Sequence, residues 1–447
     1  MSSSLSVCAP ETSPGLMAES GVDVVVQIAG EDVLAGRLWA HRRRAAQSAT
    51  FAYDAAYLTD PRAYELDPAL PLVADQHQTA VGQLLFGAFS DSAPDRWGRR
   101  LIEREQRLRA ESDELAPRRP GEIDYLLGVR DDLRQGAVRF RAPGGSVYLA
   151  EETAGVPLLV QLPVLLNAAE QLDRDEATEE ELRMLLRGGS SLGGARPKAH
   201  VLTADGRAAI AKFPSPSKDN WDVMRWEAVA LDLAQRAGIR VPRWELLEID
   251  GKAVVIIDRF DRAGALRIGF VSAMTMLGAT DHDRGCYLEI AEVIEESSPQ
   301  TSDDLRELWR RIALSILISN TDDHLRNHGF LRTSSAGWTL SPAFDLNPDP
   351  EPGPKELSTD IDFGAPSASL ETLMSVADHF RLRADEARTV LGEVVAATSQ
   401  WRAVADHHGL DRSAIEGMEP AFEHEQAVRA LQIVAPVSAP QPARDAT

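Results

Sequence analysis

The spacing of apolar and polar residues predicts a chain of short strands and more numerous helices. Near the start, apolar runs at residues 23–30 and 33–40 flank a turn at residues 30–32, a combination typical of a β-hairpin. A helical stretch is expected from about Ala80. Residues 101–115 continue it with alternating charges, which are typical of a solvated helix face.

The middle of the chain alternates strand and helix patterns around a glycine-rich loop. Lys212 lies near the end of one predicted strand, and Glu227 lies in the next helix, which Asp219 or Asn220 would cap. Asp250-Gly251 is a strong hairpin signal between two further strands. The predicted elements are a helix at 179–187, the loop at 188–198, strands at 199–203 and 207–213, a helix at 221–237, and strands at 244–249 and 252–257.

After residue 270 the pattern is mainly helical. Residues 303–319 repeat apolar side chains on one face, which predicts a buried amphipathic helix. The polar run Asn320–Asn327 follows this helix directly. A short strand pair at 329–333 and 337–340 then leads into the segment 341–348, and helices are expected up to about residue 433.

Composition places the protein among globular proteins with a substantial core. The 447 residues are 44% hydrophobic and 26% charged, and 47 basic residues against 69 acidic ones give a net charge of −22. Such a charge repels phosphate backbones, so direct nucleic-acid binding by bulk charge is not expected.

Several features favour a cytoplasmic protein. Cys8 and Cys286 cannot form a disulfide scaffold, and Cys286 is expected to be an inert buried thiol. No basic residue precedes Arg37, so the N-terminus lacks the positively charged region that a signal peptide requires. The apolar run at 313–318 is far shorter than a membrane span, so no membrane association is expected.

Changes in composition divide the chain into segments. Residues 116–122 are rich in Pro, Gly and Arg, which predicts a boundary between two folded parts. The predicted segments are a disordered leader at 1–20, an N-terminal subdomain at 21–122, a sheet-containing lobe at 123–265, a helical lobe at 266–433 and a disordered tail at 434–447.

The order of polar motifs matches the parts that phosphoryl transfer by a protein kinase needs. A glycine-rich loop precedes a strand lysine, Lys212, and a helix glutamate, Glu227. Asp322 and Asn327 have the Asp-to-Asn spacing of the kinase catalytic loop, and Asp345 follows after a short hairpin. The usual His-Arg before the first aspartate is replaced by Asn320-Thr321, and Asp-Phe-Gly is replaced by Phe344-Asp345-Leu346.

Five motifs in this order resemble the HipA-like kinases, the toxin halves of bacterial HipA/HipB toxin–antitoxin modules. They are SSLGGARPKA, AIAKF, DRFDR, NTDDHLRNHGFL and SPAFDLNP. FAYDAAYL, ALPL and LLFGAFSDSAPDRWGRRLI resemble the extra N-terminal part of that family. The resemblance covers about residues 22–430. It implies an α+β, two-lobed protein-kinase-like fold with a sheet-containing N-lobe, an all-helical C-lobe and an extra N-terminal α/β subdomain.

The resemblance also implies roles for individual residues. Asp322 would be the catalytic base, Asn327 and Asp345 the Mg²⁺ ligands, and Ser191 the autophosphorylated serine, with Ser190 as its near neighbour. ATP is the expected nucleotide. Its contacts would be Gly193, Gly194, Ala195, Arg196, Pro197, Lys198, Lys212, Asp258, Arg259, Phe260, His324, Leu325, Arg326, Asn327, Phe344 and Asp345.

Alternatives stay open for some of these residues. Asp323 is a rival for the base, although only Asp322 has the right spacing to Asn327. A zinc site near His324 is disfavoured, because thiolates are absent and oxygen ligands suit Mg²⁺ better. The Lys212–Glu227 pair is expected from the kinase order alone.

Alternatives also stay open for the function. The expected activity is transfer of the γ-phosphoryl group to a serine or threonine, and aminoacyl-tRNA synthetases are a target class of the family. A HipB-like antitoxin is the expected partner, through which the protein would reach DNA indirectly. The protein could instead be an antitoxin-binding co-repressor module with vestigial chemistry, or a small-molecule kinase.

Overall fold

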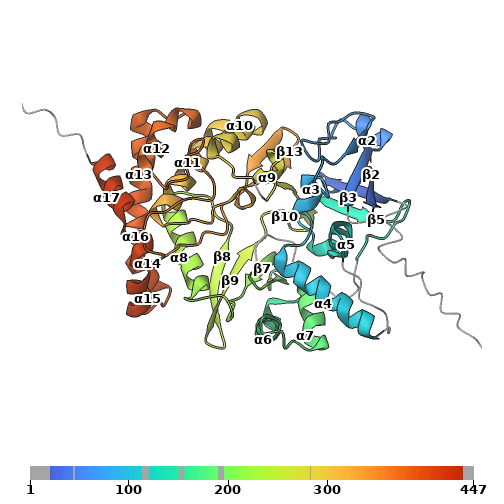
Figure 1. The fold of residues 1–447 in the computed structure, drawn as a ribbon, viewed down its shortest axis with the longest axis horizontal. Coiled ribbons are helices and arrows are strands. Elements are labelled where there is room, and N and C mark those ends of the chain that lie inside the picture. The colour runs from blue at the N-terminus through green and yellow to red at the C-terminus, as the bar shows by residue number, and fades with distance from the viewer. Residues whose placement is uncertain are drawn as a thin grey trace, which may run out of the picture.

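The structure, a computed structural model, describes residues 21–43, 46–112, 120–150, 156–189, 196–281 and 283–435. It confirms the α+β prediction. An N-terminal sheet, a central sheet and a helical body follow one another along the long dimension of the molecule (Figure 1). The predicted leader, and the predicted tail from residue 436 on, lie outside the described ranges.

The N-terminal region is built on an antiparallel sheet with the strand order β4-β3-β2-β1-β5. The predicted hairpin is confirmed, because Ala29 and Gly30, with φ of 50° and 87°, turn β1 into β2. The strand β5 comes from beyond residue 122 and pairs with β1. The strands are β1 (Val22–Ile28), β2 (Glu31–Arg43), β3 (Ala46–Tyr53), β4 (Gln76–Gln78) and β5 (Val138–Arg141).

Helices cover this sheet and connect it to the rest of the chain. The helical stretch predicted from Ala80 begins only at Gly87, so the predicted start is wrong. It is also divided into α3 and α4, since Pro94 disfavours helical backbone at the residue before it. Aromatic side chains, among them Phe51 and Phe89, fill the core between helices and sheet. The helices are α2 (Ala55–Thr59), α3 (Gly87–Asp91), α4 (Arg96–Ser112) and α5 (Glu122–Gly128).

The central sheet has the order β6-β7-β9-β8 and is buried on both faces. Along β9, Val255 and Ile257 pack into the core that contains α8, whereas Val254 and Ile256 pack into the core that contains α6 and α7. This alternation follows from the two-residue period of a strand. The elements are β6 (Lys198–Leu202), β7 (Ala208–Lys212), β8 (Trp244–Ile249), β9 (Lys252–Asp258), α6 (Leu162–Asp173), α7 (Glu179–Gly188) and α8 (Val223–Arg236).

Two local predictions in this region have different outcomes. The Asp250-Gly251 hairpin is confirmed, with φ of 50° and 75° at these residues. The predicted cap of α8 is wrong: Asp222, not Asp219 or Asn220, accepts the hydrogen bond from the Arg225 backbone N–H. The carboxylate of Asp219 instead accepts from the backbone N–H of Ser215.

The helical body surrounds α11 (Thr301–Leu317), which confirms the predicted amphipathic helix. The predicted strand pair is also confirmed as β13 (Gly329–Ser334) and β14 (Gly337–Leu340). A third strand, β12 (Gly269–Ser272), pairs with β13, so this half is not entirely helical. Among the described residues, no helix has the length and apolar character needed to cross a bilayer.

Further helices complete the body. Buried aliphatic residues of α10, α11 and α13 form one core with α8 and β9. The remaining elements of this half are α9 (Ala273–Met276), α10 (Tyr287–Ser297), η3 (Leu325–Asn327), α12 (Leu370–Ser375), η4 (Ala377–Phe380), α13 (Ala384–Thr398), α14 (Trp401–His407), α15 (Arg412–Gly417), α16 (Glu419–Phe422) and α17 (Glu425–Val434).

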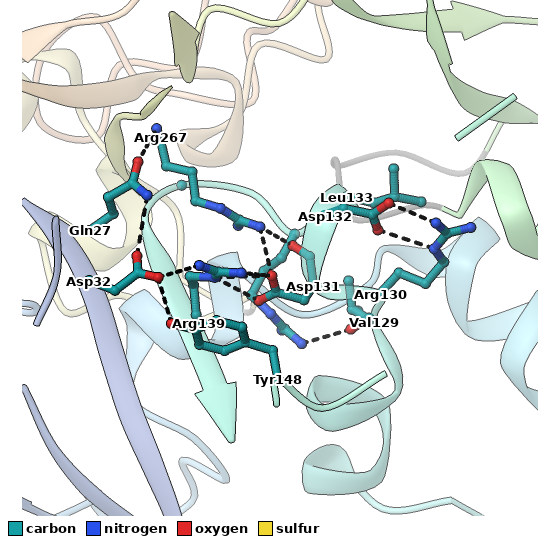
Figure 2. A network of polar contacts seen from close by, with 12 residues as sticks. Gln27, Asp32, Val129, Arg130, Asp131, Asp132, Leu133, Arg139, Tyr148 and Arg267 are labelled. Carbon is teal, nitrogen blue, oxygen red and sulfur yellow. Dashed lines mark hydrogen bonds and ion pairs between the residues drawn. The ribbon is translucent and has the colours of Figure 1, made fainter. Parts of the chain in front are cut away.

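A polar junction joins the N-terminal sheet to the segment after β9 (Figure 2). Arg139 of β5 lies between two carboxylates, with nitrogen–oxygen distances of 2.6 Å to Asp32 and 2.5 Å to Asp131. Arg267 reaches Asp131 at 3.0 Å from the hairpin of β10 (Arg262–Ala263) and β11 (Leu266–Arg267). The N-terminal region is thus connected by ion pairs to the chain that leaves the central sheet.

Candidate active site

Lys212, at the end of β7, connects three elements of the site. Its Nζ is 2.5 Å from Oε1 of Glu227 in α8 and 3.0 Å from Oδ1 of Asp345. The predicted Lys212–Glu227 pair is therefore confirmed, and the structure adds Asp345 to it. Burial by itself lowers the pKa of Lys212, but the two carboxylates raise it above its ordinary value. The side chain is thus a fixed positive charge between the central sheet and the helical body.

Asp345 follows β14 in an extended segment and has left-handed backbone, with φ of 60°. For an aspartate this conformation is costly, and its side chain is held by hydrogen bonds from Lys212 and from Nδ2 of Asn347, the latter 3.2 Å long. Burial opposes ionisation of Asp345. The positive charges of Lys212 and Lys198 outweigh burial and keep the pKa of this carboxyl below its ordinary value.

Asp322 begins the catalytic-loop motif and carries an exposed side chain. Its backbone carbonyl accepts a hydrogen bond of 3.0 Å from Nδ2 of Asn327, which closes the loop between them. Partial desolvation and the negative charges of Asp345 and Asp323 raise the pKa of Asp322. A raised pKa suits a carboxylate that must accept a proton near neutral pH.

The neighbouring Asp323 is buried, and both of its carboxylate oxygens are occupied. Oδ2 accepts from the Tyr287 hydroxyl at 2.5 Å and from Ser315 at 3.2 Å, and Oδ1 lies 3.1 Å from Nε2 of His328. Burial opposes ionisation, but these contacts lower the pKa of Asp323 below its ordinary value. Asp323 therefore anchors the loop, which leaves Asp322 as the accessible carboxylate.

Two asparagines, to which no role was assigned from the sequence, connect the loop to the segment of Asp345. Asn320 is fully buried, donates to Oγ of Ser315 at 3.3 Å, and accepts from the backbone N–H of Asn347 at 3.1 Å. Asn347 in turn donates to Asp345. Because both asparagines lie inside motifs of the family resemblance, the sequence could have indicated that they belong to the site. Nothing in the local sequence indicates that Tyr287 does.

Arg196 and Lys198 are the described end of the glycine-rich loop. Arg196 donates to Asp219 at 3.0 Å, and its positive charge opposes part of the rise in the pKa of Asp322. Nζ of Lys198 is 2.7 Å from Oδ2 of Asp95. Pro197 is buried, and its carbonyl accepts from the Phe213 backbone N–H. Gly193, Gly194, Ala195, Ser190 and Ser191 lie outside the described residues.

The site therefore has two sides. We call Arg196, Lys198, Lys212 and Glu227 the sheet wall, since β6, β7, α8 and the loop before them supply these residues. We call Asn320, Asp322, Asp323, Asn327, Asp345 and Asn347 the helical wall. The ion pair between Lys212 and Asp345 crosses from one wall to the other.

The predicted hinge at residues 258–260 begins at Asp258, the last residue of β9. Arg259 is buried, and its guanidinium donates to both oxygens of Asp261, at 2.9 and 2.6 Å, and to the Leu133 carbonyl. Asp258 is paired with Arg207. These two side chains therefore stabilise the hinge, and the predicted adenine contacts of this segment stay a prediction for its backbone and for Phe260.

The other predicted nucleotide contacts lie on or beside the helical wall. Leu325 is buried, Arg326 pairs with Asp281 at 2.8 Å, and His324 is half-buried next to Asp322. The ring of Phe344 lies 5.4 Å from that of Phe260, centroid to centroid. Phe344 thus places the start of the Asp345 segment against the hinge.

The donor atoms of the helical wall fit Mg²⁺ better than a transition metal. Among the described residues, no hydrogen bond occupies Oδ2 of Asp345 or Oδ1 of Asn327, and these are the oxygen ligands that Mg²⁺ prefers. Within the same ranges, no three His, Cys, Asp or Glu side chains form a group that could hold a metal ion. Mg²⁺ commonly combines one or two protein oxygens with substrate phosphates, so two ligands are sufficient.

Cys286 has the environment of an inert thiol. It is buried at the start of α10, and burial raises the pKa of its thiol to about 11. A thiolate is therefore scarce at neutral pH, and Cys286 is unsuited to act as a nucleophile.

Comparison with known proteins supports this organisation. Residues 26–116 match the HipA N-terminal domain, and residues 190–401 match the HipA-like C-terminal domain. A chain in the structure of the HipA, HipB and operator DNA complex of Shewanella oneidensis has the same fold. The two share 14% identity and a TM-score of 0.61, over 92% of this chain and 96% of that one.

Two curated relatives are similar over shorter stretches. The presumed kinase Y4dM of Sinorhizobium fredii is 30% identical over 164 residues, which is 33% of this chain and 39% of the relative. A second presumed kinase, from Haemophilus influenzae, is 25% identical over 189 residues, 36% of this chain and 54% of the relative. The match thus spans about half or less of these relatives. The two domain matches, in the expected order, show that the chain belongs to the HipA-like kinase family.

Proposed function

We propose that this protein is an ATP- and Mg²⁺-dependent serine/threonine protein kinase. The observation that carries the proposal is the position of Lys212, which contacts Glu227 on the sheet wall and Asp345 on the helical wall. A lysine paired with a helix glutamate, facing a metal-binding aspartate, is the arrangement that holds the nucleotide phosphates in kinases. The names of the two curated relatives agree with this activity.

Each residue then has a definite task in the transfer. Asp322 accepts the proton of the substrate hydroxyl while the hydroxyl oxygen bonds to the γ-phosphorus. At the same time, the bond from that phosphorus to the bridging oxygen of ADP breaks. Lys212 offsets negative charge on the phosphates. Asp345 and Asn327 would hold Mg²⁺, which neutralises charge on the phosphate oxygens when bound. The chemistry is thus mainly positioning and charge neutralisation.

The test is phosphoryl transfer from radiolabelled ATP by the purified full chain. We expect Asp322→Asn to lower the rate by about 10²- to 10⁴-fold, because the general base is lost. Asp345→Asn should abolish transfer. Asp303→Asn, an exposed aspartate on the first turn of α11, is the matched control and should be as active as the wild type. Activity that persists in Asp322→Asn would reject Asp322 as the base.

The loop serine provides an assay that does not need the target. We propose that Ser191 receives the phosphate during incubation with Mg-ATP, with Ser190 as the alternative acceptor. Intact mass should then show one added phosphate on the wild type and none on Ser191→Ala. No phosphate on this loop or on any protein, including the aminoacyl-tRNA synthetases as first candidates, would favour a binding role.

A HipB-like antitoxin is the proposed partner. The support is the similar chain, which was solved together with HipB and operator DNA. A net charge of −22 suits a basic partner and disfavours direct DNA contact. Co-purification with the product of a neighbouring reading frame should give DNA binding that the chain alone lacks. Equal DNA binding by the chain alone would contradict this proposal.

A further inference from the structure

Asp95 connects the N-terminal region to the sheet wall. It precedes α4, and its Oδ1 accepts a hydrogen bond of 2.7 Å from the backbone N–H of Gly98, as an N-cap does. Its Oδ2 lies 2.7 Å from Nζ of Lys198, at the start of β6. Both side chains are almost inaccessible, with exposed fractions of 4% and 6%. One carboxylate thus caps a helix and binds the lysine.

A second contact holds the same residue by its backbone. Nε1 of Trp97 donates to the carbonyl of Lys198 at 3.0 Å. Trp97 and Leu101 of α4 also pack into the core between the central sheet and α6 and α7. Figure 1 shows α4 next to α7, to the right of the labelled strands of the central sheet. Lys198 is therefore held from both its backbone and its side chain by α4.

The segment from Asp91 to Asp95 also contacts the helical half of the molecule. Asp91, the last residue of α3, accepts from the backbone N–H of Ser272 at 2.7 Å and from the Thr275 hydroxyl at 2.7 Å. It lies 3.7 Å from Arg326 of the catalytic loop. Asp91 and Asp95 thus contact the two halves of the site from a single segment.

These contacts bear on the chemistry because of where Lys198 lies. It follows the glycine-rich loop and lies directly opposite Lys212 in the antiparallel ladder of β6 and β7, so the two lysine side chains share one face of the sheet. An ion pair between two buried groups fixes the direction of the lysine side chain, which an exposed pair would not. The position of this charge therefore depends on a residue about a hundred positions earlier in the chain.

We propose that Asp95 is a positioning residue for phosphoryl transfer: it holds the Lys198 ammonium toward the nucleotide end of the site. The N-terminal region is then part of the nucleotide site and not only an added subdomain. This inference rests on the proposed kinase function. It assigns no catalytic role to Asp95 itself, which acts through Lys198.

The test compares Asp95→Asn with the wild-type full chain. Asparagine retains a good N-cap oxygen but turns an amide donor toward Lys198, so the helix cap is kept and the ion pair is lost. We expect KM for Mg-ATP to rise by about tenfold, with a smaller change in kcat. Asp411→Asn, which changes the N-cap of α15, is the matched control and should leave both constants unchanged.

Two further variants separate positioning from folding. In a Lys198→Met background, Asp95→Asn should add little to KM, since its effect passes through Lys198. If Asp95→Asn fails to fold, Trp97→Phe removes the hydrogen bond to the Lys198 carbonyl while an aromatic ring still fills most of its place in the core, and it should still raise KM. An unchanged KM in a folded Asp95→Asn or Trp97→Phe protein would overturn the inference. A wild type that does not bind Mg-ATP would instead refute the proposed function.

Discussion

The two walls of the site are held in place by different kinds of contact. On the sheet wall, Lys198 and Lys212 each end in an ion pair, with Asp95 and with Glu227. On the helical wall, amide and hydroxyl hydrogen bonds predominate, from Asn320, Asn327 and Tyr287. The sheet wall presents mainly positive charge and the helical wall negative charge, as a site for phosphates and a cation requires.

This difference suggests how each wall responds to substitution. Removing one partner of a buried ion pair leaves an uncompensated charge, which costs more than the pair itself contributes. Removing one amide from a hydrogen-bonded loop costs less, because its partners are neutral. Substitutions of the ion-paired residues of the sheet wall should therefore lower the unfolding free energy more than substitutions of the amide residues of the helical wall.

The largest effect on stability is expected for Lys212→Met. It removes the cation between Glu227 and Asp345, so we expect an unfolding free energy lower by about 3–5 kcal/mol and a rate lower by about 10²- to 10³-fold. Chemical denaturation and the ATP assay measure the two effects. Lys252→Met, on β9 of the same sheet and paired with Glu170, is the control. A fully active Lys212→Met protein would contradict the role given to this lysine.

Asp323→Asn tests the anchor of the helical wall. It disturbs the contacts with Tyr287, Ser315 and His328, so we expect a loss of about 2–4 kcal/mol of stability. Activity should fall by about 10- to 100-fold, since Asp322 and Asn327 would shift. If Asp323→Asn is more damaging to activity than Asp322→Asn in a protein of unchanged stability, the assignment of the base is reversed.

The stability difference between wild type and Asp323→Asn should also depend on pH. The pKa of Asp323 is lower in the folded state than in the unfolded chain, so its ionised form stabilises the fold above the unfolded pKa. This contribution is lost as the pH falls through the folded value. Denaturation curves should therefore converge below about pH 4, and a constant difference across that range would show that Asp323 is not ionised in the fold.

Asn320→Ala should have a smaller effect. Its amide links Ser315 to the backbone of Asn347, and its loss should cost about 1–3 kcal/mol of unfolding free energy. We expect a moderate fall in kcat, because the Asp345 segment is less firmly held to the catalytic loop. Asn167→Ala, an exposed asparagine of α6, serves as the control. Equal kcat values for Asn320→Ala and Asn167→Ala would contradict the role of Asn320 in holding the Asp345 segment.

The smallest effect is expected for Ile312→Val in the core of α11. The side chain is fully buried, so removing one methylene should cost about 0.5–1.5 kcal/mol. The rate should not change, because Ile312 supports the helical wall from behind without contacting it through polar groups. Thermal denaturation and kcat, measured together, check this. A large loss of kcat with little loss of stability would show that core packing sets the catalytic geometry.

Much of the local structure could be predicted from the sequence. The hairpins at residues 29–30 and 250–251, the helix α11 and the strand pair of β13 and β14 follow from turn residues and from apolar spacing. The Lys212–Glu227 pair followed from motif order and is confirmed. The predicted cap of α8 was wrong. Three neighbouring polar residues can each cap a helix, and only the path of the chain selects Asp222.

The sequence by itself determined the elements and the family, because strand and helix periods and turn residues act over a few positions, and because the motifs keep their order. Only the tertiary structure decided that Asp322 is accessible while Asp323 is buried, and that Asp95 meets Lys198. Adjacent aspartates look alike in a sequence, and burial distinguishes them. Ion pairs between distant residues depend on how helices and sheets pack, which no local pattern specifies.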